Sequence, residues 1–471
     1  MKKLSELYEG YPDIPIKGIK INSKQIEEGD IFVCVMGVNV DRHNYIDEAI
    51  SNGASALVVS RDIDASVPVI KVENTNSELP VLASKFYDHP EKELDIIGTT
   101  GTNGKTTVAS IIQDLIGNDT CGYLGTNGII CSKFNESIRN TTPDSDRLYD
   151  YFRRFVNSGC KVLSMEASSE AFYRNRLSLI KFKIGIITNI TGDHLNVHKT
   201  LENYVSCKQK LVEQVSDDGF SILNIDDSYY DRIKDSAKGT ILTYGRRDST
   251  LQIMDTNLSL SNTLITFKYN NKLYKVNSPL LGEFNVSNLA AAILALLAYG
   301  YEIEDIISRV SNIKVPNGRV QRLDYGQDYH IILDYAHTTD AFSKLFQLIN
   351  EVKTSRVITI TGSAGGREKE KRPSMGKVVL DKSDYVIFTM DDPRYEDPKD
   401  IIFDLVSGSN KNNYEIIVDR KEAIYRAFSL AEKDDIILVA GKGCDNYMAI
   451  EDKYLPYNDL EVIDSYFKKE D

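Results

Sequence analysis

The sequence predicts a multi-domain α/β protein, and three observations carry that prediction. The chain has 471 residues, which at roughly 150 residues per domain corresponds to about three domains. Short apolar runs, typical of strands buried in parallel sheets, alternate with helical patterns along most of the chain. One of these runs leads through a glycine-rich loop into an amphipathic helix. We therefore expect three α/β domains, spanning residues 1–89, 90–320 and 321–471.

The overall composition is that of a soluble globular protein. The chain contains 56 Lys plus Arg against 69 Asp plus Glu, a net charge of −13, so it lacks the basic face that nucleic acid requires. Its longest apolar run, residues 289–299, is far shorter than the roughly 20 residues of a membrane span. The six cysteines are scattered, which is typical of free thiols in a reducing compartment. We expect a cytoplasmic protein with no nucleic-acid partner and no membrane span.

Each domain has its own pattern of elements. In the first, apolar runs at 31–38, 56–60 and 68–72 predict strands, and 45–54 predicts a helix ending at Gly53. Pro90 punctuates a helical pattern and indicates a boundary. In the second, 161–169 and 183–190 predict buried strands, and 289–299 predicts a helix. The third has five strand-like runs, several ending in Gly or Asp, as expected where strand ends face a ligand. These runs are 329–337, 356–365, 384–393, 414–419 and 435–443.

The glycine-rich loop is the most informative segment. Residues 98–107 read GTTGTNGKTT, and backbone N–H groups in such a loop at a helix N-terminus cradle phosphate oxygens. Lys105 would reach the β- and γ-phosphates, and the Thr106 hydroxyl would bind Mg²⁺. Thr99 stands where a strict Walker A motif has glycine, and a chance glycine turn is the alternative. The segment predicts a nucleoside triphosphate site formed by Gly101, Thr102, Asn103, Gly104, Lys105, Thr106 and Thr107.

Residues on later elements bear on the class of nucleotide enzyme. A GTPase would carry an NKxD motif, and the Asn-Lys pair at Asn271 lacks the Asp. Glu166 ends an apolar strand, where an acid could hold Mg²⁺, although a solvated strand-end acid fits equally well. His194 follows another strand and is a candidate Mg²⁺ ligand. Lys208 lies on a following helical segment, where spacing alone favours a solvated helix face.

Several motifs together resemble the Mur ligases, the ATP-dependent amide-bond ligases of peptidoglycan synthesis. Within that family they look like the members that add the third peptide residue. The resemblance runs in order through nearly the whole chain. It implies an amino-terminal UDP-sugar domain, a central P-loop ATPase domain with a mostly parallel sheet, and a carboxy-terminal Rossmann-like domain. The motifs lie at residues 98–107, 140–145, 165–169, 191–198, 203–208, 334–341, 371–376, 391–394 and 441–447.

The resemblance implies roles for individual residues. Lys105, His194 and Lys208 are implied to be catalytic, and Lys208 is implied to be carbamylated to N6-carboxylysine. The implied Mg²⁺ ligands are Thr106, Glu166, His194 and the Lys208 carbamate. Besides the glycine loop, the implied ATP contacts are Asn288, Arg319 and Asp334. The UDP-sugar peptide would contact Ser23, Thr141, Thr142, Ser168 and Arg176. The incoming amino acid would contact Arg372, Asp392, Arg394, Gly441 and Asp445.

The chain departs from the family pattern at five places. Residues 21–23 read INS in place of an Asp-Ser pair, and Glu170 replaces a histidine in SSH. Thr339 replaces a proline in HTPD, and residues 315–319, VPNGR, carry one extra residue. Cys444 and Asp445 replace the His-Glu of GKGHE. Asp445 belongs to the implied amino-acid pocket, so this change concerns the identity of the amino acid more than the reaction.

The implied reaction brings an anion to a polyanion. A substrate carboxylate attacks the ATP γ-phosphate, and the amine of the incoming residue then displaces the acyl phosphate. Two unit charges 4 Å apart repel by about 4 kcal/mol at an effective dielectric near 20, so cations must lie between them. Lys105 and Mg²⁺ would supply that charge, and His337 is a candidate base for the amine. The expected partners are UDP-N-acetylmuramoyl-L-alanyl-D-glutamate, ATP and a free amino acid, bound by a monomer.

Arg394 indicates which amino acid is added. A planar guanidinium binds a carboxylate through two hydrogen bonds, and meso-diaminopimelate ends in a second carboxylate where lysine ends in an ammonium only. We therefore expect meso-diaminopimelate, unless Arg394 pairs instead with Asp391, Glu396 or Asp397. The alternatives are a paralogue that adds L-lysine or another amino acid or acts in specialised peptide synthesis, a folylpolyglutamate-synthetase-like enzyme, and a non-catalytic scaffold protein.

Overall fold

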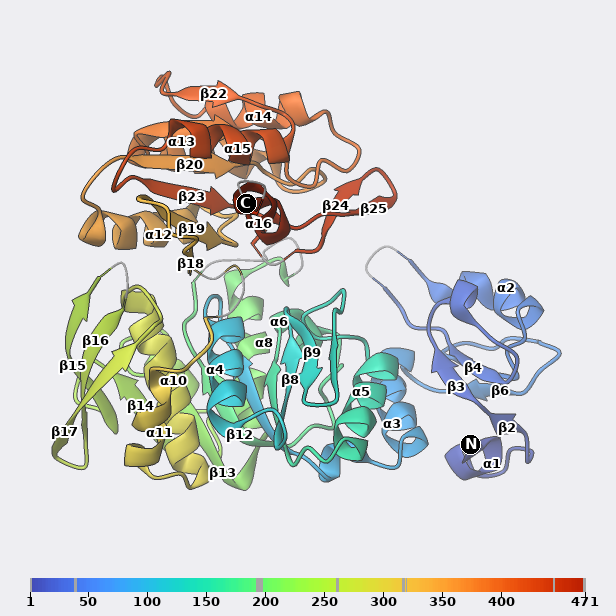
Figure 1. The fold of residues 1–471 in the computed structure, drawn as a ribbon. Helices are drawn as coiled ribbons and strands as arrows, with labels where there is room; N and C mark the ends of the chain where they lie inside the picture. Colours follow the sequence, from blue (N-terminus) through green and yellow to red (C-terminus); the bar gives the residue numbers. More distant parts are fainter. Residues whose placement is uncertain are drawn as a thin grey trace. The chain divides into compact units, whose positions relative to one another are not determined.

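The computed structural model describes residues 2–37, 40–191, 198–259, 262–315, 318, 320–443 and 445–468. It forms two compact units, each built from α/β elements (Figure 1). One unit comprises Met1–Gln252 and Ser287–Ile306, and the other comprises Ile253–Val286 and Ile307–Asp471. Within the described ranges, no helix combines the length and the apolar character needed to cross a membrane.

The first unit begins with a small parallel sheet whose strand order is β3-β4-β5-β6. The predicted strands are confirmed, but β4 ends at Val33 rather than continuing to residue 38. The Cys34 N–H still donates to the Val58 carbonyl of β5 at 2.9 Å. Beyond it the backbone leaves the ladder, and the Met36 N–H donates to the Asn76 side chain at 2.8 Å. The strands are β1 (Lys2–Lys3), β2 (Pro15–Ile16), β3 (Gly18–Lys20), β4 (Asp30–Val33), β5 (Ala56–Val59) and β6 (Val69–Lys71). The helices are α1 (Leu4–Leu7), α2 (Ile46–Ser51) and α3 (Thr75–Phe86).

A second sheet in this unit is parallel through β8-β11-β7-β12-β13-β14. The carboxyl ends of β7, β11 and β12 share one edge, because Thr99 pairs with Glu166 and Thr100 with Ile187. The strands are β7 (Asp95–Thr100), β8 (Cys121–Gly125), β9 (Gly128–Cys131), β10 (Phe134–Glu136), β11 (Val162–Glu166), β12 (Phe182–Ile187), β13 (Val215–Asn224) and β14 (Thr240–Gly245). The helices are α4 (Lys105–Ile116), α5 (Ser145–Asn157), α6 (Ser169–Tyr173), α8 (Leu201–Glu213) and α9 (Tyr230–Lys234).

The helix predicted at residues 289–299 begins earlier than expected. It is α10 (Glu283–Tyr299), and residues 289–296 are all buried, as expected for a helix that is apolar on every side. Three strands precede it in the sequence, β15 (Leu251–Leu258), β16 (Thr263–Tyr269) and β17 (Lys272–Ser278), and α11 (Ile303–Val310) follows α10.

The second unit holds a doubly wound sheet in the order β18-β19-β23-β20-β21-β22. All five predicted runs are strands, and apolar helices pack on both faces. The strands are β18 (Gln321–Leu323), β19 (His330–Asp334), β20 (Val357–Thr361), β21 (Tyr385–Phe388), β22 (Tyr414–Ile416) and β23 (Ile436–Ala440). The helices are α12 (Thr339–Val352), α13 (Arg372–Lys382), α14 (Pro398–Val406), α15 (Arg420–Leu430) and α16 (Asp459–Phe467). The sequence did not predict the hairpin of β24 (Tyr447–Ile450) and β25 (Lys453–Pro456).

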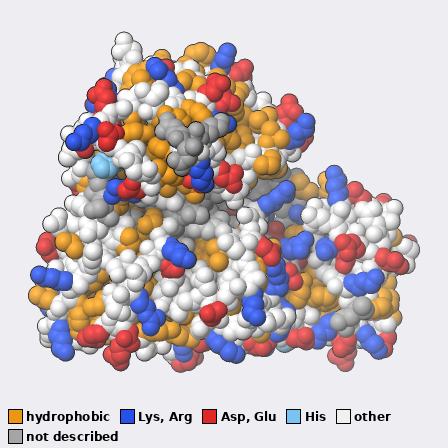
Figure 2. Space-filling view, viewed as in Figure 1, with side chains coloured by type: hydrophobic (Ala, Val, Ile, Leu, Met, Phe, Trp, Pro, Cys, Tyr) orange, Lys and Arg blue, Asp and Glu red, His pale blue; other side chains and the backbone are white. Residues whose placement is uncertain are grey.

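Acidic and basic side chains are interspersed over the face seen in Figure 2, without a broad patch of one sign.

Candidate active site

The phosphate loop joins β7 to α4 and is shaped by two glycines. Gly104 is the N-cap of α4 with a φ of +88°, and a Cβ there would lie 2.3 Å from the Asn288 Oδ1 atom. Gly101 has a φ of +155°, and a Cβ there would lie 1.9 Å from the Thr188 Oγ1 atom. Only glycine therefore fits at these two positions. The loop leads directly into the N-terminus of α4, and backbone N–H groups at a helix N-terminus bind phosphate. Two N–H groups of the loop are already engaged, since those of Thr102 and Asn103 donate to the Asn189 carbonyl and side chain at 2.8 and 3.0 Å.

Two lysines converge on the carbonyl groups of this loop. Lys105 Nζ donates to the Gly101 carbonyl at 2.9 Å and to the Thr102 carbonyl at 3.0 Å. Lys208 Nζ, from α8, donates to the same Gly101 carbonyl at 2.6 Å. Lys208 is 1% exposed, and its ammonium lies 4.5 Å from the centre of the Tyr204 ring. A solvated helix face for Lys208 is therefore wrong, because α8 directs this side chain into the phosphate loop.

Glu166 and Thr106 meet beneath the loop. Glu166 is fully buried, and its Oε2 atom accepts the Thr106 hydroxyl at 3.0 Å. Its Oε1 atom accepts the Tyr123 hydroxyl at 2.6 Å and the Thr126 N–H at 2.7 Å. A solvent-exposed Glu166 is thus wrong. The partners of the Glu166 carboxylate among the described residues are hydroxyl and N–H groups, and a buried carboxylate bonded in this way fits a metal ion.

Two of the other residues predicted to contact the nucleotide or its metal, Asn288 and Asp334, lie in the described part of the chain. Asn288 lies on α10 beside Gly104. Asp334 ends β19, and its carboxylate accepts the backbone N–H groups of Val320 and Ala336, each at 2.7 Å. His194 and Arg319 lie outside the described residues. In the part of the chain that the structure describes, no group of three or more His, Cys, Asp or Glu side chains is arranged to hold a metal.

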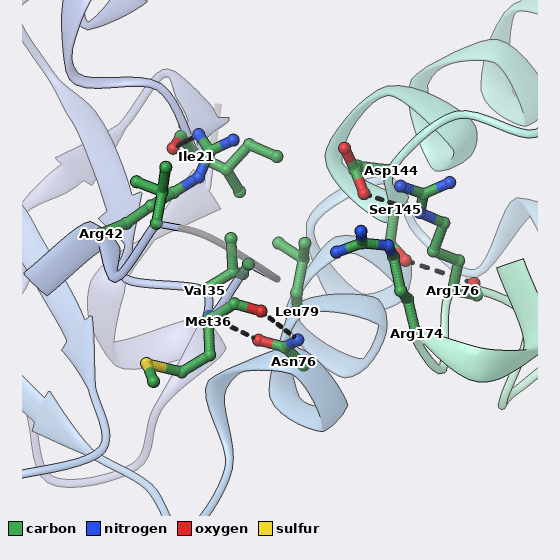
Figure 3. A pocket seen from close by; sticks show the side chains of 12 residues that line it. Ile21, Val35, Met36, Arg42, Asn76, Leu79, Asp144, Ser145, Arg174 and Arg176 are labelled. Carbon is green, nitrogen blue, oxygen red and sulfur yellow. Dashed lines mark hydrogen bonds and ion pairs between the residues drawn. The ribbon is translucent and has the colours of Figure 1, made fainter. Parts of the chain in front are cut away.

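A cavity of about 340 Å³ lies beside α3 and carries three arginines (Figure 3). Arg42 comes from the small sheet domain, and Arg174 and Arg176 follow α6. Apolar Val35 and Leu79 line the same cavity. The sequence analysis missed Arg42 and Arg174. Arg174 had a local signal, since it lies two residues from the predicted Arg176, but nothing in the sequence around Arg42 indicated a ligand.

Four of the five residues predicted for the UDP-sugar peptide lie close together. The Thr142 hydroxyl donates to the Glu166 carbonyl at 2.8 Å and accepts the Ser168 N–H at 3.1 Å. Arg176 donates to the Thr142 carbonyl at 2.9 Å and pairs with Asp144 at 2.6 Å. Thr141 contacts this group through Thr126. The Ser23 hydroxyl donates to Glu48 at 2.5 Å, and Ser23 is not one of the residues that line the cavity.

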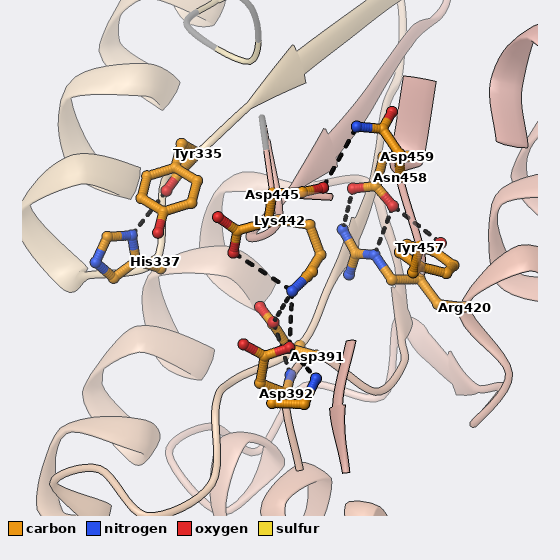
Figure 4. A network of polar contacts seen from close by, with 12 residues as sticks. Tyr335, His337, Asp391, Asp392, Arg420, Lys442, Asp445, Tyr457, Asn458 and Asp459 are labelled. Atoms are coloured by element: carbon orange, nitrogen blue, oxygen red, sulfur yellow. Dashed lines mark hydrogen bonds and ion pairs between the residues drawn. The ribbon is translucent and has the colours of Figure 1, made fainter. Parts of the chain in front are cut away.

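A second polar cluster lies in the other unit, where β23 ends (Figure 4). Lys442 is fully buried, and its Nζ atom lies 2.7 Å from Asp392 Oδ1, 3.4 Å from Asp445 Oδ2 and 3.8 Å from Asp391 Oδ1. Burial raises the pKa of Asp445 to about 6, against the opposing effect of Lys442. Burial lowers the pKa of Lys442, but Asp391, Asp445 and Asp392 outweigh it and raise that pKa overall. Sequence reasoning missed Lys442 although it lies next to Gly441 in the recognised motif.

Arg394 follows this cluster in the DDPR motif and has a left-handed backbone with a φ of +54°. The hairpin of β24 and β25 holds that conformation, since the Arg394 N–H donates to the Ala449 carbonyl at 3.0 Å and the Glu451 N–H donates to the Arg394 carbonyl at 2.8 Å. Among the described residues the Arg394 guanidinium pairs with no carboxylate, and its Nε atom has no hydrogen-bond partner. Glu396, one of the acids considered as its partner, binds Arg372 instead.

Two further arginines of this unit are buried and form ion pairs. Arg372 donates to Glu396 and Asp404, each at 2.9 Å, and is 2% exposed, so the structure gives its guanidinium an internal partner. Arg420 binds both oxygens of Asp459, at 2.8 and 2.7 Å, and its NH2 group donates to the Ala440 carbonyl at 2.9 Å. The Arg420 pair fixes the strand end that precedes Gly441.

Comparison with known proteins matches every part of this architecture. The models described as "Mur ligase family, catalytic domain", "Mur ligase middle domain" and "Mur ligase, glutamate ligase domain" match residues 15–87, 99–296 and 318–443. A protein of Fusobacterium nucleatum named UDP-N-acetylmuramoyl-L-alanyl-D-glutamate--2,6-diaminopimelate ligase is 40% identical, covering 94% of this chain and 92% of that protein. A Bacillus cereus protein of the same name is 37% identical, covering 96% and 95%.

A solved structure agrees with these sequence matches. It is titled as a UDP-N-acetylmuramoyl-L-alanyl-D-glutamate--2,6-diaminopimelate ligase and superimposes with a TM-score of 0.69 at 27% identity. The match covers 100% of this chain and 99% of that one. The chain therefore belongs to the Mur ligase family.

Proposed function

We propose that the chain is an ATP-dependent ligase that joins meso-diaminopimelate to UDP-N-acetylmuramoyl-L-alanyl-D-glutamate through an acyl phosphate. One observation carries this proposal: the chain matches enzymes named for that reaction over nearly its full length, at 37–40% identity. Addition of L-lysine or another amino acid is the alternative that the experiment below tests. The cytoplasmic location and the monomeric state stay predictions from the sequence.

The phosphate loop supplies the ATP-binding part of the proposal. Its N–H groups at the start of α4 would hold phosphate oxygens, with Asn288 beside Gly104 on the nucleotide. On binding ATP, Lys105 would exchange the loop carbonyls that it now contacts for phosphate oxygens. Its ammonium would then reduce the repulsion between the phosphates and the attacking carboxylate.

Thr106 and Glu166 fit a Mg²⁺ site, because a buried carboxylate and a hydroxyl lie 3.0 Å apart next to the loop. Bound there, Mg²⁺ would neutralise phosphate charge during transfer. His194 and a carbamylated Lys208 complete the proposed ligand set. Carbamylation would turn the Lys208 ammonium into an anionic group, and the burial of this side chain next to Gly101 would hold that group near the phosphates.

The three-arginine cavity is the proposed site of the UDP-sugar. Arg42, Arg174 and Arg176 would bind the two phosphate groups, since guanidinium groups match phosphate geometry. Thr141, Thr142 and Ser168 connect this cavity to Glu166. They would thereby direct the peptide end of the substrate toward the phosphate loop, where its carboxylate reacts.

Arg394 and Asp445 are the proposed contacts for the distal end of meso-diaminopimelate. The guanidinium of Arg394, which pairs with no carboxylate among the described residues, suits the second carboxylate, and the Asp445 carboxylate suits the neighbouring ammonium. L-Lysine lacks that second carboxylate, so it would leave Arg394 without an anion. Gly441 and Asp392 would line the same pocket, and Arg372 would support it through Glu396.

Release of phosphate from ATP tests the proposal directly. The purified chain is incubated with ATP, Mg²⁺ and UDP-N-acetylmuramoyl-L-alanyl-D-glutamate, with meso-diaminopimelate, with L-lysine or without amino acid. We expect phosphate release and the tripeptide product with meso-diaminopimelate, and at most slow release without amino acid. Equal or better turnover with L-lysine would show that the proposed amino acid is wrong. No release with any amino acid would contradict the ligase proposal itself.

A further inference from the structure

Lys442 is a buried cation at the end of β23, and neither the motifs nor the proposed reaction gives it a role. Its side chain is fully buried and lies among three carboxylates in Figure 4. The shortest contact, 2.7 Å, joins its Nζ atom to Asp392 Oδ1. The Tyr447 ring lies on another side of the ammonium, with its centre 4.9 Å away. These contacts surround the ammonium with protein groups.

The cluster carries more negative than positive charge. Lys442 is the one cation within ion-pair distance of Asp391, Asp392 and Asp445 among the described residues. The nearby Arg420 is neutralised by Asp459, with which it forms a fully buried pair. Buried charges require partners, so the three carboxylates leave room for one further cation. An ammonium group on the incoming amino acid has the required charge.

The three carboxylates are not equally available to such an ammonium. Asp392 Oδ1 accepts both Lys442 Nζ and the Ala449 N–H, at 2.7 and 2.9 Å. Asp391 Oδ1 accepts the Asp392 N–H at 2.7 Å. Asp445 has only the longer contact of 3.4 Å to Lys442, and its Oδ1 atom bonds to no described residue. Asp445 is thus the carboxylate with the most remaining capacity to bind a ligand.

We infer that Lys442 is a positioning residue of the amino-acid pocket, which fixes Asp392 to the hairpin and orients Asp445 toward the ammonium of the incoming amino acid. This inference rests on the proposed function. Lys442 itself does not touch the substrate, because its ammonium is enclosed by Asp392, Asp445 and Tyr447. Without it, Asp445 would lose the one cationic side chain that lies within ion-pair distance among the described residues, and with it its orientation.

The test separates amino-acid binding from the first half of the reaction. Lys442→Met keeps the length of the side chain and removes its charge. Lys377→Met is the matched control, because Lys377 also forms a 2.7 Å ion pair, with Asp381, but is exposed. Each protein is assayed for acyl phosphate formed from ATP and the UDP-substrate without amino acid, trapped by borohydride reduction. The KM and kcat for meso-diaminopimelate are then measured in the complete reaction.

We expect Lys442→Met to form acyl phosphate within twofold of the unmodified protein, while its KM for meso-diaminopimelate rises at least tenfold and kcat changes less than threefold. Lys377→Met should match the unmodified protein in acyl phosphate formation, in KM and in kcat. A folded Lys442→Met with unchanged KM would overturn the inference, and so would equal losses in both half-reactions. An inactive unmodified protein would instead refute the proposed function.

A second variant covers the case in which Lys442→Met does not fold. Lys442→Met with Asp392→Asn removes one positive and one negative charge together, so no new unpaired charge is buried beside Ala449. Because Asp392 is itself a proposed pocket residue, the double variant is compared with Asp392→Asn alone. It should fold and show at least a tenfold higher KM than that single variant, because Asp445 remains unanchored. An unchanged KM would overturn the inference. Failure of both variants to fold would assign Lys442 to stability alone and would overturn it as well.

Discussion

The phosphate loop and the amino-acid pocket are built in opposite ways. The loop uses the backbone of one short segment, residues 101–104, and its shape depends on two glycines at which a Cβ would collide with Thr188 or Asn288. The pocket uses side chains from segments far apart in the sequence, with Asp392 and Lys442 50 positions apart. A backbone site is therefore specified locally, whereas a side-chain site exists only once the chain has folded.

This difference predicts how each region responds to substitution. Changes at the loop should reduce ATP-dependent chemistry whichever amino acid is supplied. Changes at the pocket should affect one substrate and leave acyl phosphate formation intact. The following predictions test that separation.

The largest effect is expected at Lys208. Lys208→Ala should lower kcat by about 10³-fold, the upper range for removing one electrostatic contact from an active site, because the buried side chain lies at the phosphate loop. Lys210→Ala on the same helix is the control and should stay within twofold. Phosphate release at saturating substrates measures both. Near-normal activity in Lys208→Ala would refute the carbamate proposal and the catalytic role together.

A smaller but more selective effect is expected at Arg394. Arg394→Ala should raise the KM for meso-diaminopimelate about 10- to 100-fold, since a charge-assisted hydrogen bond contributes roughly 1.5 to 3 kcal/mol. Arg426→Ala removes an exposed arginine that pairs with Glu415 and should change the KM less than twofold. Steady-state kinetics with varied amino acid measure both. If Arg394→Ala also weakened ATP binding, it would contradict the prediction that the phosphate loop and the amino-acid pocket act independently.

Substitutions at the two glycines that cap α4, Gly104 and Gly117, separate the cost of backbone strain from the cost of a steric contact at the phosphate loop. Gly104→Ala and Gly117→Ala both place a side chain at positive φ, which costs about 1–2 kcal/mol, but only the Gly104 Cβ would meet another atom. Gly104→Ala should weaken ATP binding about tenfold, while Gly117→Ala should lower the unfolding free energy alone. Calorimetric titration with ATP and thermal unfolding measure the two effects. Equal ATP affinity in both variants would count against the Gly104–Asn288 contact.

The same contrast explains how much the sequence could predict. The central strands of the sheets, several helices and the phosphate loop followed from local patterns, because hydrophobic periodicity and glycine spacing act over a few residues. Strand β4 was predicted too long, since its last apolar residues lie outside the ladder beside Asn76. The roles of Arg394 and Asp445 came only from family resemblance. Lys442 was missed because Asp391 and Asp392 are brought beside it only by the folded sheet.

The arginines show a further limit of sequence reasoning. Arg372 and Arg394 both lie in recognised motifs and were assigned to the same pocket. The structure gives Arg372 two carboxylate partners and gives the Arg394 guanidinium none among the described residues. Sequence alone cannot distinguish them, because the partners Glu396 and Asp404 lie 24 and 32 positions from Arg372.

The smallest predicted effect is the pH dependence of the amino-acid pocket. Burial raises the pKa of Asp445 to about 6, above its ordinary value, with Asp391 and Asp392 adding to the shift and Lys442 opposing it. A protonated Asp445 cannot bind an ammonium as an anion. The KM for meso-diaminopimelate should therefore rise as the pH falls below about 6, by about fourfold at pH 5.5 relative to pH 8, while the KM for ATP stays constant. Asp445→Asn should have a higher KM that does not vary over this range.

Stability gives an independent check of the same carboxyl group. Because folding raises the pKa of Asp445, the folded state binds a proton more tightly than the unfolded state does. The stability of the unmodified protein relative to Asp445→Asn should then fall as the pH rises from about 4 to about 6, and stay lower above that range. Urea unfolding of both proteins at pH 4.5 and pH 8 measures this difference. A difference that is equal at the two pH values would show that Asp445 titrates normally, and the pH dependence of the KM would then need another group.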